Sequence, residues 1–530
     1  FLKTTYNSES RVQEYLPIAE RGYLSMTDGA SFSYDGNVTL NYNTLVNEKH
    51  IIYAGAGLEV TQNDNNSHGF IMTGFPDDRY SDPAFAIQYK KETKPSSSES
   101  KSRAIGFFAN GNYSYDDRYF ADVSVRIDGS SKFGADKKYA PFWSAGAGWN
   151  VHNEKFFKHT KISMLKLRYS YGVTGNQEFS AYQAKTMFQF NTDRLYNSGI
   201  SAALMGYGNP DLEWQNQYQS NYGFDFGYAK DRIRLQFNYY QKKTEGMLTS
   251  VSVAPSLGLP SNTFTSNLGK IQNKGVEVNL NAVLIRDQGK DFEWSVMLQA
   301  AHNKNKIMEI STALKNINEK NNQDKTTPAA VYEEGESMSA IKAVPSLGID
   351  PTTGQELFMK KDGTITYTWD ATDKVICGDS EPKVFGNVGT NLYWKGWNLN
   401  MVFKYDLGAD YYNSTLAERV EGANPRYNAD RRVLNNRWKE PGQHALYKNI
   451  KEYTTTYISS RFVQKENTLQ LTSLSLSYDL NREWIRKFGL NTMRLSFYMN
   501  DVFRASTVKN ERGLDYPFQR SFVFGLNIGF

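Results

Sequence analysis

Long hydrophobic runs are missing from this sequence. No stretch supplies the roughly 20 apolar residues that a membrane-spanning helix needs, and the mean hydropathy is -0.61 over 530 residues. The one cysteine, Cys377, excludes an internal disulfide framework. The net charge is only +5, from 61 basic and 56 acidic residues, which argues neither for nor against nucleic acid; we expect no nucleic-acid partner. These shortages exclude a helical membrane protein and a disulfide-stapled domain.

Catalytic patterns are missing as well. The six histidines lack the spacing of zinc ligands, and the sequence contains neither a nucleophile elbow nor a phosphate-binding glycine loop. Paired carboxylates such as Asp116 and Asp117 fall in predicted turns, where side chains are usually solvated. We therefore expect no enzyme, no metal site and no cofactor. The histidines are His50, His68, His152, His159, His302 and His444.

Aromatic residues are abundant, and they alternate with small or polar residues. They make up 14% of the chain, as 35 tyrosines, 31 phenylalanines and 9 tryptophans. At the C-terminal end, Phe522, Phe524 and Phe530 share one strand face, whereas Gly525 and Asn527 share the other. This pattern is typical of a membrane β-barrel strand, whose two faces meet lipid and a watery lumen. Four tryptophans at predicted strand ends are expected in the interfacial girdles: Trp149, Trp214, Trp294 and Trp394.

The same alternation recurs in segments long enough to cross a bilayer. Ile233, Leu235 and Phe237, for example, alternate with arginine, glutamine and asparagine. A tilted transmembrane strand takes about 9–11 residues, and charges stay almost entirely off the apolar faces. We predict an all-β fold, a transmembrane antiparallel β-barrel with about fifteen strands in this chain. They span 35–45, 50–62, 103–115, 119–128, 142–152, 164–173, 214–228, 231–242, 271–284, 291–303, 384–394, 397–407, 467–480, 491–500 and 519–530.

Short and long connections alternate between these strands. The short ones carry turn residues, as in Asn47-Glu48-Lys49. Because outer-membrane barrels have short periplasmic turns and long outer loops, we predict that the long connections are external. Residues 94–100, rich in serine, are expected to form a loop tip. The main external loops are predicted at 63–102, 174–213, 243–270, 304–383 and 408–466.

An odd number of strands does not close a bacterial single-chain barrel, because such barrels have even counts. The first predicted strand runs inward, which makes 1–34 an external loop segment and 35–530 the C-terminal portion of a barrel. We therefore expect a second chain or fragment that supplies the remaining strands. It would pair with the edges of strands 35–45 and 519–530 in outer-membrane lipid.

Six motifs resemble, in the same order, signatures of the SusC-like TonB-dependent transporters. The longest, residues 113–134, reads YSYDDRYFADVSVRIDGSSKFG. A seventh, shorter match is NDVF at 500–503, where the family usually has an Asn-Leu-Phe-like element. Together the matches run from about residue 100 to the end. The other five are 139–149, 165–176, 209–214, 267–277 and 378–383.

The resemblance implies a 22-stranded barrel in the outer membrane of a Gram-negative bacterium, with a plug domain inside it. It also implies an N-terminal motif that engages TonB. Neither the plug nor that motif is found in this sequence, so the expected second fragment carries the plug and about seven strands. The implied function is TonB-dependent active import of a bulky nutrient, an oligosaccharide or a peptide, together with a SusD-like surface lipoprotein that closes over the barrel as a lid.

Aromatic side chains in the long loops are the candidate substrate contacts. Trp369, Tyr411 and Tyr412 offer faces that stack on sugar rings or pack against peptide side chains. They fit a loop core or a partner interface equally well. A passive porin or a structural barrel subunit is the alternative function, which a plug-bearing partner segment would exclude. A soluble β-sandwich lectin would require that the apolar strand faces are buried against protein.

Overall fold

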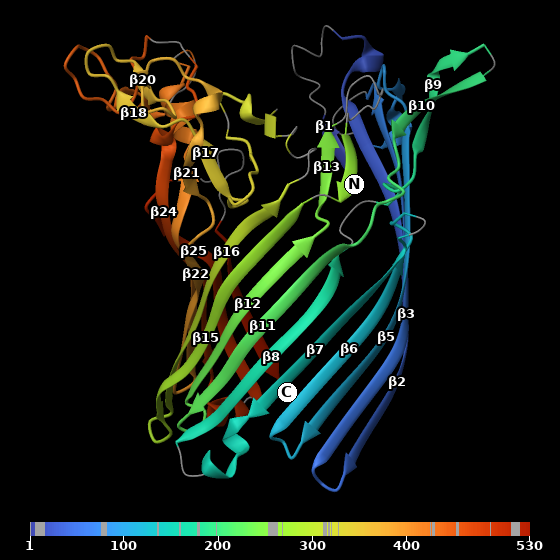
Figure 1. The fold of residues 1–530 in the computed structure, drawn as a ribbon, viewed down its shortest axis with the longest axis vertical. Helices are drawn as coiled ribbons and strands as arrows, with labels where there is room; N and C mark the ends of the chain where they lie inside the picture. Colours follow the sequence, from blue (N-terminus) through green and yellow to red (C-terminus); the bar gives the residue numbers. More distant parts are fainter. Residues whose placement is uncertain are drawn as a thin grey trace.

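One curved antiparallel sheet forms most of the structure (Figure 1). The computed structural model describes residues 2–5, 16–75, 82–134, 137–157, 161–176, 181–197, 199–252, 263–267, 269–310, 315, 318–319, 321–326, 328–424, 426, 430–451, 455–487, 489–509 and 520–530. The sheet has 17 strands among these residues. They are β1 (Leu2–Thr5), β2 (Tyr23–Val46), β3 (His50–Thr73), β4 (Gln88–Tyr89), β5 (Ser96–Tyr115), β6 (Tyr119–Ser130), β7 (Tyr139–Asn150), β8 (Ile162–Asn176), β11 (Gln215–Tyr228), β12 (Ile233–Glu245), β15 (Lys270–Asp287), β16 (Phe292–Glu309), β22 (Val384–Trp394), β23 (Trp397–Tyr412), β24 (Val463–Asp479), β25 (Thr492–Ser506) and β26 (Phe522–Gly529).

Long strands that follow one another in sequence lie side by side, always antiparallel. β2 pairs with β3, β3 with β5, and the series continues to β25 and β26. In the β11–β12 pair, Phe224 faces Phe237 and the two rings stack with centroids 5.2 Å apart. The next pair, Asp225 and Gln236, points to the other side of the sheet. Apolar and polar residues therefore occupy opposite faces, as the alternation predicted.

Each of the fifteen predicted strands corresponds to one long strand of this sheet, so the all-β, antiparallel prediction is confirmed. The short turns are also found where they were predicted. Asn47 and Glu48 join β2 to β3 with φ angles of 50° and 57°. Two consecutive positive φ values are the geometry of the tight hairpin turn that matches strand twist.

Two neighbouring strands are much longer than predicted. β2 begins at Tyr23, inside the segment 1–34, and β3 continues to Thr73, inside the predicted loop 63–102. The two strands pair in continuous register over this whole length. Apolar alternation marks only the part of a strand that meets lipid, and it is interrupted in the added part, where residues 27–31 and 63–69 are polar or small. The pattern therefore gave no sign of it.

Polar side chains hold this extension together. Ser31 Oγ donates a hydrogen bond to Asn65 Oδ1 at 2.7 Å across the β2–β3 pair. β5 also reaches further than expected, because it begins at Ser96 and pairs with β3. Most of 94–100 is therefore strand, and the prediction of a loop tip there was wrong. The backbone of β3 supplies the hydrogen-bond partners of this segment. A serine-rich composition does not indicate that such a partner strand is present.

Most of the smaller elements occupy the end of the sheet that carries the long connections (Figure 1). Among the described residues, no helix is long and apolar enough to cross a membrane. The small strands are β9 (Met187–Tyr196), β10 (Gly199–Gly206), β13 (Leu248–Ser252), β14 (Thr263–Asn267), β17 (Ala340–Ala343), β18 (Ser346–Ile349), β19 (Glu356–Met359), β20 (Ile365–Thr366) and β21 (Val375–Asp379). The helical turns are η1 (Ile18–Glu20), η2 (Pro83–Phe85), η3 (Val151–Asn153), η4 (Lys155–Phe157), η6 (Ala371–Asp373), η7 (Leu416–Glu421), η8 (Arg431–Leu434), η9 (Ser460–Phe462) and α3 (Arg482–Arg486). Of these, η3, η4 and α3 lie at the opposite end of the sheet, between β7 and β8 and between β24 and β25 (Figure 1).

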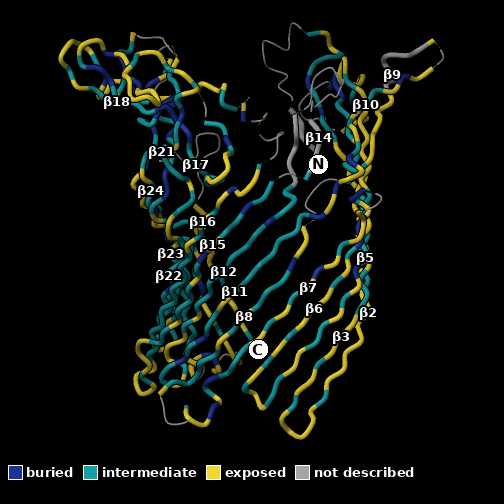
Figure 2. The backbone as a smooth tube through the Cα atoms, in the orientation of Figure 1, coloured by how far each residue is buried: buried dark blue, intermediate teal, exposed yellow. Residues whose placement is uncertain are grey.

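The outermost strands of the sheet, β2 and β26, each have an edge without a described partner. β1 covers only residues 23–26 of β2, and β26 pairs with β25 alone among the described strands. β2 is exposed over most of its length (Figure 2), and so is β26. Leu40 is 77% exposed and Phe524 is 75% exposed. The sheet thus presents two free hydrogen-bonding edges within the described part of the chain.

Candidate functional site

The long connections after β16 and β23 fold against each other into one body, which we call the loop module. It consists of the described residues of 331–383 and 409–462, and it stands above one part of the barrel wall (Figure 1). Trp438 of one connection donates its Nε1 hydrogen to the carbonyl of Pro351 in the other at 2.8 Å. Phe462, only 1% exposed, is among the largest fully buried side chains. The module is therefore a packed unit with its own core.

Trp369 lines a cavity of about 320 Å³ in this module. Its ring stacks on Tyr457 with centroids 5.1 Å apart and an angle of 11° between the planes. Its Nε1 donates a hydrogen bond to the carbonyl of Ile458 at 2.9 Å. Lys374 Nζ lies 5.7 Å from the Trp369 ring centroid, and Glu356 also lines the cavity. Aromatic faces combined with a few polar groups are what a ligand with apolar and hydroxyl or amide surfaces requires.

Tyr411 and Tyr412 end β23, where they pair with the start of β24. The Tyr412 ring packs edge-on against Phe462, with centroids 6.0 Å apart. Burial raises the pKa of the Tyr412 phenol well above its ordinary value, and nearby carboxylates add to the shift. Neither tyrosine is among the described residues that line the cavity beside Trp369. The structure brings all three predicted residues into one module but places only Trp369 at this cavity.

A buried network of ion pairs fixes one wall of the cavity. Arg461 binds Glu356 at 2.8 Å and Glu421 at 2.6 Å. The Glu421 side chain is completely buried and that of Glu356 is 4% exposed. Burial opposes the charged form of Arg461, but the two carboxylates outweigh it and raise the pKa of the guanidinium above its ordinary value. The network therefore holds Glu356 in a single position in the cavity wall.

Asp350 closes a tight turn between β18 and β19. Its Oδ1 accepts hydrogen bonds from Thr352 N at 2.9 Å and Thr352 Oγ1 at 2.8 Å. Its Oδ2 accepts one from the Tyr367 hydroxyl at 2.5 Å. These bonds, that of Tyr367 first among them, hold the pKa of Asp350 far below its usual range. The ionised carboxylate thus joins the turn to the segment that leads from β20 to Trp369.

Acid is expected to open this turn. Because the folded-state pKa is depressed, Asp350 contributes its full stabilisation above the unfolded-state pKa of about 3.9 and loses it as the pH falls further. Hydrogen–deuterium exchange of residues 350–367, corrected for intrinsic rates, should be constant from about pH 8 to about pH 5 and rise below about pH 4. Asp350→Asn should show the raised exchange at every pH. Parallel pH profiles for the two proteins would contradict this assignment.

No pattern in the sequence pointed to Glu356, Glu421 or Arg461. Charged residues in long loops are mostly solvated, and Glu356 and Arg461 are 105 positions apart in the chain. No spacing pattern connects residues on two separate loops. We find no sequence signal that would have identified this network.

Comparisons with known proteins agree on one family. A family model described as TonB dependent receptor-like, beta-barrel, matches residues 2–500. TonB-dependent receptor P3 of Formosa agariphila is 28% identical over 486 residues, which cover 82% of this chain and 46% of that protein. TonB-dependent receptor SusC of Bacteroides thetaiotaomicron is 23% identical over 535 residues, which cover 94% of this chain and 51% of that protein. The structure of the RagAB peptide transporter matches with a TM-score of 0.84 and 22% identity, covering 96% of this chain and 56% of that one.

The chain spans about half the length of the curated relatives it matches. The structural match shows the barrel fold, so the apolar strand faces are lipid-facing and a soluble β-sandwich lectin is excluded. The predicted outer-membrane location is likewise confirmed. The chain belongs to the TonB-dependent receptor β-barrel family of Gram-negative outer membranes.

Proposed function

We propose that this chain takes part in TonB-dependent active import of a bulky nutrient, an oligosaccharide or a peptide. Its family consists of outer-membrane transporters, and one structural match is a peptide transporter. The observation that carries the proposal is the cavity beside Trp369, where an aromatic face and the fixed carboxylate of Glu356 meet. Trp369 is the proposed stacking residue. Tyr411 and Tyr412 are proposed to shape the module around it.

A SusD-like lipoprotein is proposed as the lid over the loop module. Exposed apolar surface that gathers on one face of a protein usually marks a binding face. Several large apolar side chains of the module are exposed, which supports a partner on this side. They include Leu347 (55%), Ile365 (62%), Leu434 (71%) and Leu446 (60%).

The free edges of β2 and β26 support a further partner segment. It would carry the plug, about seven strands and the TonB contact, and would complete a 22-stranded barrel. Each unpaired backbone group in lipid costs several kcal/mol, so the segment should remain attached during purification. Native mass spectrometry of the complex from outer membranes should show this segment and the lipoprotein together with the chain. A lone 60.4 kDa species that forms a complete barrel would rule out the segment.

Changes in the cavity wall should weaken uptake without loss of the barrel. Gln355 lines the cavity, and Gln355→Ala leaves the Arg461 network intact. Trp369→Phe keeps a ring but removes the indole hydrogen bond. Each is expected to lower uptake at limiting ligand by about two- to tenfold, as expected for one lost polar contact. Uptake can be measured in cells with a fluorescent peptide pool and a fluorescent oligosaccharide pool.

Gln288→Ala provides the matched control, because Gln288 lies in a short turn at the other end of the wall. It should take up both pools at the parental rate. A protonophore should abolish uptake, since TonB requires an energised inner membrane. Uptake that persists with the protonophore would favour the passive porin.

A further inference from the structure

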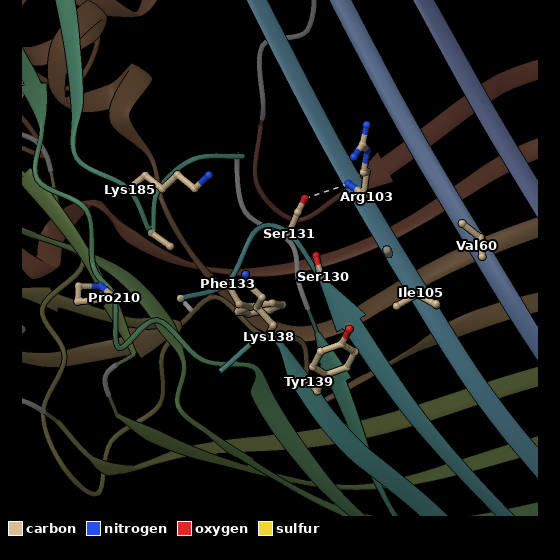
Figure 3. A pocket seen from close by; sticks show the side chains of 14 residues that line it. Val60, Arg103, Ile105, Ser130, Ser131, Phe133, Lys138, Tyr139, Lys185 and Pro210 are labelled. Carbon is tan, nitrogen blue, oxygen red and sulfur yellow. Dashed lines mark hydrogen bonds between the residues drawn. The ribbon is translucent and has the colours of Figure 1, made fainter. Parts of the chain in front are cut away.

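A second cavity, of about 500 Å³, lies where β3, β5, β6 and β7 approach their long connections (Figure 3). The strand register shows which way it faces. Val60 pairs with Ile105, Ile105 with Gly129, and Gly129 with Tyr139. Directly paired residues lie on the same side of a sheet, and this side also carries Phe107 two residues further along β5. These strand residues of the cavity wall therefore lie on the side of the sheet that faces away from the barrel lumen.

The cavity lies at the level of the membrane interface. β6 starts at Tyr119 at the short-turn end, and a tilted strand crosses the bilayer in about 9–11 residues. Val125 and Ile127, 46% and 44% exposed, belong to its lipid-facing stretch. Gly129 and Tyr139 come just beyond it, and Tyr139, 63% exposed, occupies the place of an interfacial aromatic residue. The lower wall thus borders hydrocarbon and the upper wall borders head groups.

The upper wall is cationic. Arg103, Lys138 and Lys185 line the cavity, and the described lining residues include no aspartate or glutamate. Asp64 interacts electrostatically with Arg103, but its carboxylate already forms an ion pair with Lys101 at 2.9 Å. Three positive charges therefore surround one concave site without a carboxylate in its wall.

The connection between β6 and β7 is held in place before any ligand binds. The backbone of Ser131 donates to the Arg103 carbonyl at 2.9 Å, and Arg103 N donates to Ser131 Oγ at 2.9 Å. Phe133 stacks on Trp214 with centroids 4.3 Å apart. A Cβ on Gly134 would lie 1.7 Å from a facing backbone oxygen, so only glycine allows this close approach. Trp214, 5% exposed, is thus a loop anchor, and its prediction as a girdle residue was wrong.

We propose that this cavity binds a phosphorylated lipid of the outer leaflet. Its phosphate groups would lie against Arg103, Lys138 and Lys185, and its acyl chains would lie along Val60 and Ile105. Charge-assisted hydrogen bonds from arginine and lysine suit phosphate. A free anion gains nothing from the apolar lower wall, and a neutral lipid gains little from three cations. The site lies outside the barrel and so is separate from the proposed nutrient path.

The test uses the complex purified from outer membranes and stripped of lipid with detergent. The probes are lipid A with both phosphates and the same lipid after enzymatic removal of the phosphates, each titrated by native mass spectrometry. The phosphorylated form should bind at least about tenfold more tightly. The triple variant Arg103→Gln, Lys138→Gln, Lys185→Gln should bind both lipids with the affinity that the parent has for the dephosphorylated lipid. Its melting temperature should be unchanged.

A matched triple variant removes the same charge at the opposite rim, through Lys49→Gln, Lys290→Gln and Lys395→Gln in short turns. It should keep the parental preference for the phosphorylated form. Equal binding of the two lipids to the parent would overturn the proposal, as would an unchanged preference in the Arg103 triple variant. Inorganic phosphate that binds as tightly as the phosphorylated lipid would assign the site to a free anion.

Discussion

Phe237→Arg is expected to abolish assembly of the barrel, whereas Gln236→Arg at the neighbouring position is tolerated. Phe237 lies on the lipid-facing side of β12 and stacks on Phe224. An arginine on the lipid face costs about 2–4 kcal/mol near the bilayer midplane, which is a large part of the stability of a typical domain. Gln236 points into the lumen directly opposite Asp225, which is already paired with Arg168 at 2.9 Å, so an arginine there stays hydrated beside an existing ion pair.

The amount of heat-modifiable, folded protein in the outer-membrane fraction measures this difference. Phe237→Arg should leave little folded protein, and Gln236→Arg should resemble the parent. Because both changes add one arginine to the same strand, synthesis and export are matched. Equal amounts of folded protein from the two variants would show that the assignment of strand faces is incorrect.

Arg461→Ala is expected to unfold the loop module and leave the barrel wall assembled. The change removes the cation that joins two buried carboxylates. It leaves Glu356 without its described ion-pair partner, while Glu421 keeps Lys448 at 3.9 Å. Removal of one partner of a buried ion pair costs about 3–5 kcal/mol, because the remaining charge is buried without compensation. The wall is joined by its own strand pairs, so the damage should stay within the module.

Hydrogen–deuterium exchange can localise the effect. Residues 413–424 and 455–462 should lose protection in Arg461→Ala, while β11 and β12 stay protected. Arg494→Ala is the control, because Arg494 and its partner Asp479 are 54% and 42% exposed and exposed pairs contribute about 1 kcal/mol or less. If the module keeps its protection in Arg461→Ala, the ion network is not what holds it together.

The two variants address parts of the chain that are stabilised in different ways. The wall is stabilised by strand pairing and by lipid on its apolar face. The loop module is stabilised by buried side chains such as Ile458 and Phe462 and by its ion network. Loss of uptake with an intact wall is therefore the expected phenotype of a module variant.

The strands of the barrel wall were predictable from sequence, because the alternation of apolar and polar residues within one strand shows which of its faces meets lipid. Phe522, Phe524 and Leu526 alternate whether or not β25 is known, and the strand was placed correctly on that basis. Prediction failed at 63–73 and at 96–100, where β3 and β5 continue beyond the lipid as polar strands. There the partner strand supplies the hydrogen bonds, and the local sequence is mostly polar, without a long apolar alternation.

The sequence by itself determined the class of fold, the strands, their lipid-facing sides and the candidate aromatic residues. These depend on a period of two residues, which is a local property. Only the tertiary structure decided that Trp369 lines a cavity while Tyr412 packs beside Phe462. Only the tertiary structure revealed the ion pair between Arg461 and Glu356. Contacts between loops far apart in the chain depend on where the sheet holds their ends, and the residues of neither loop contain that information.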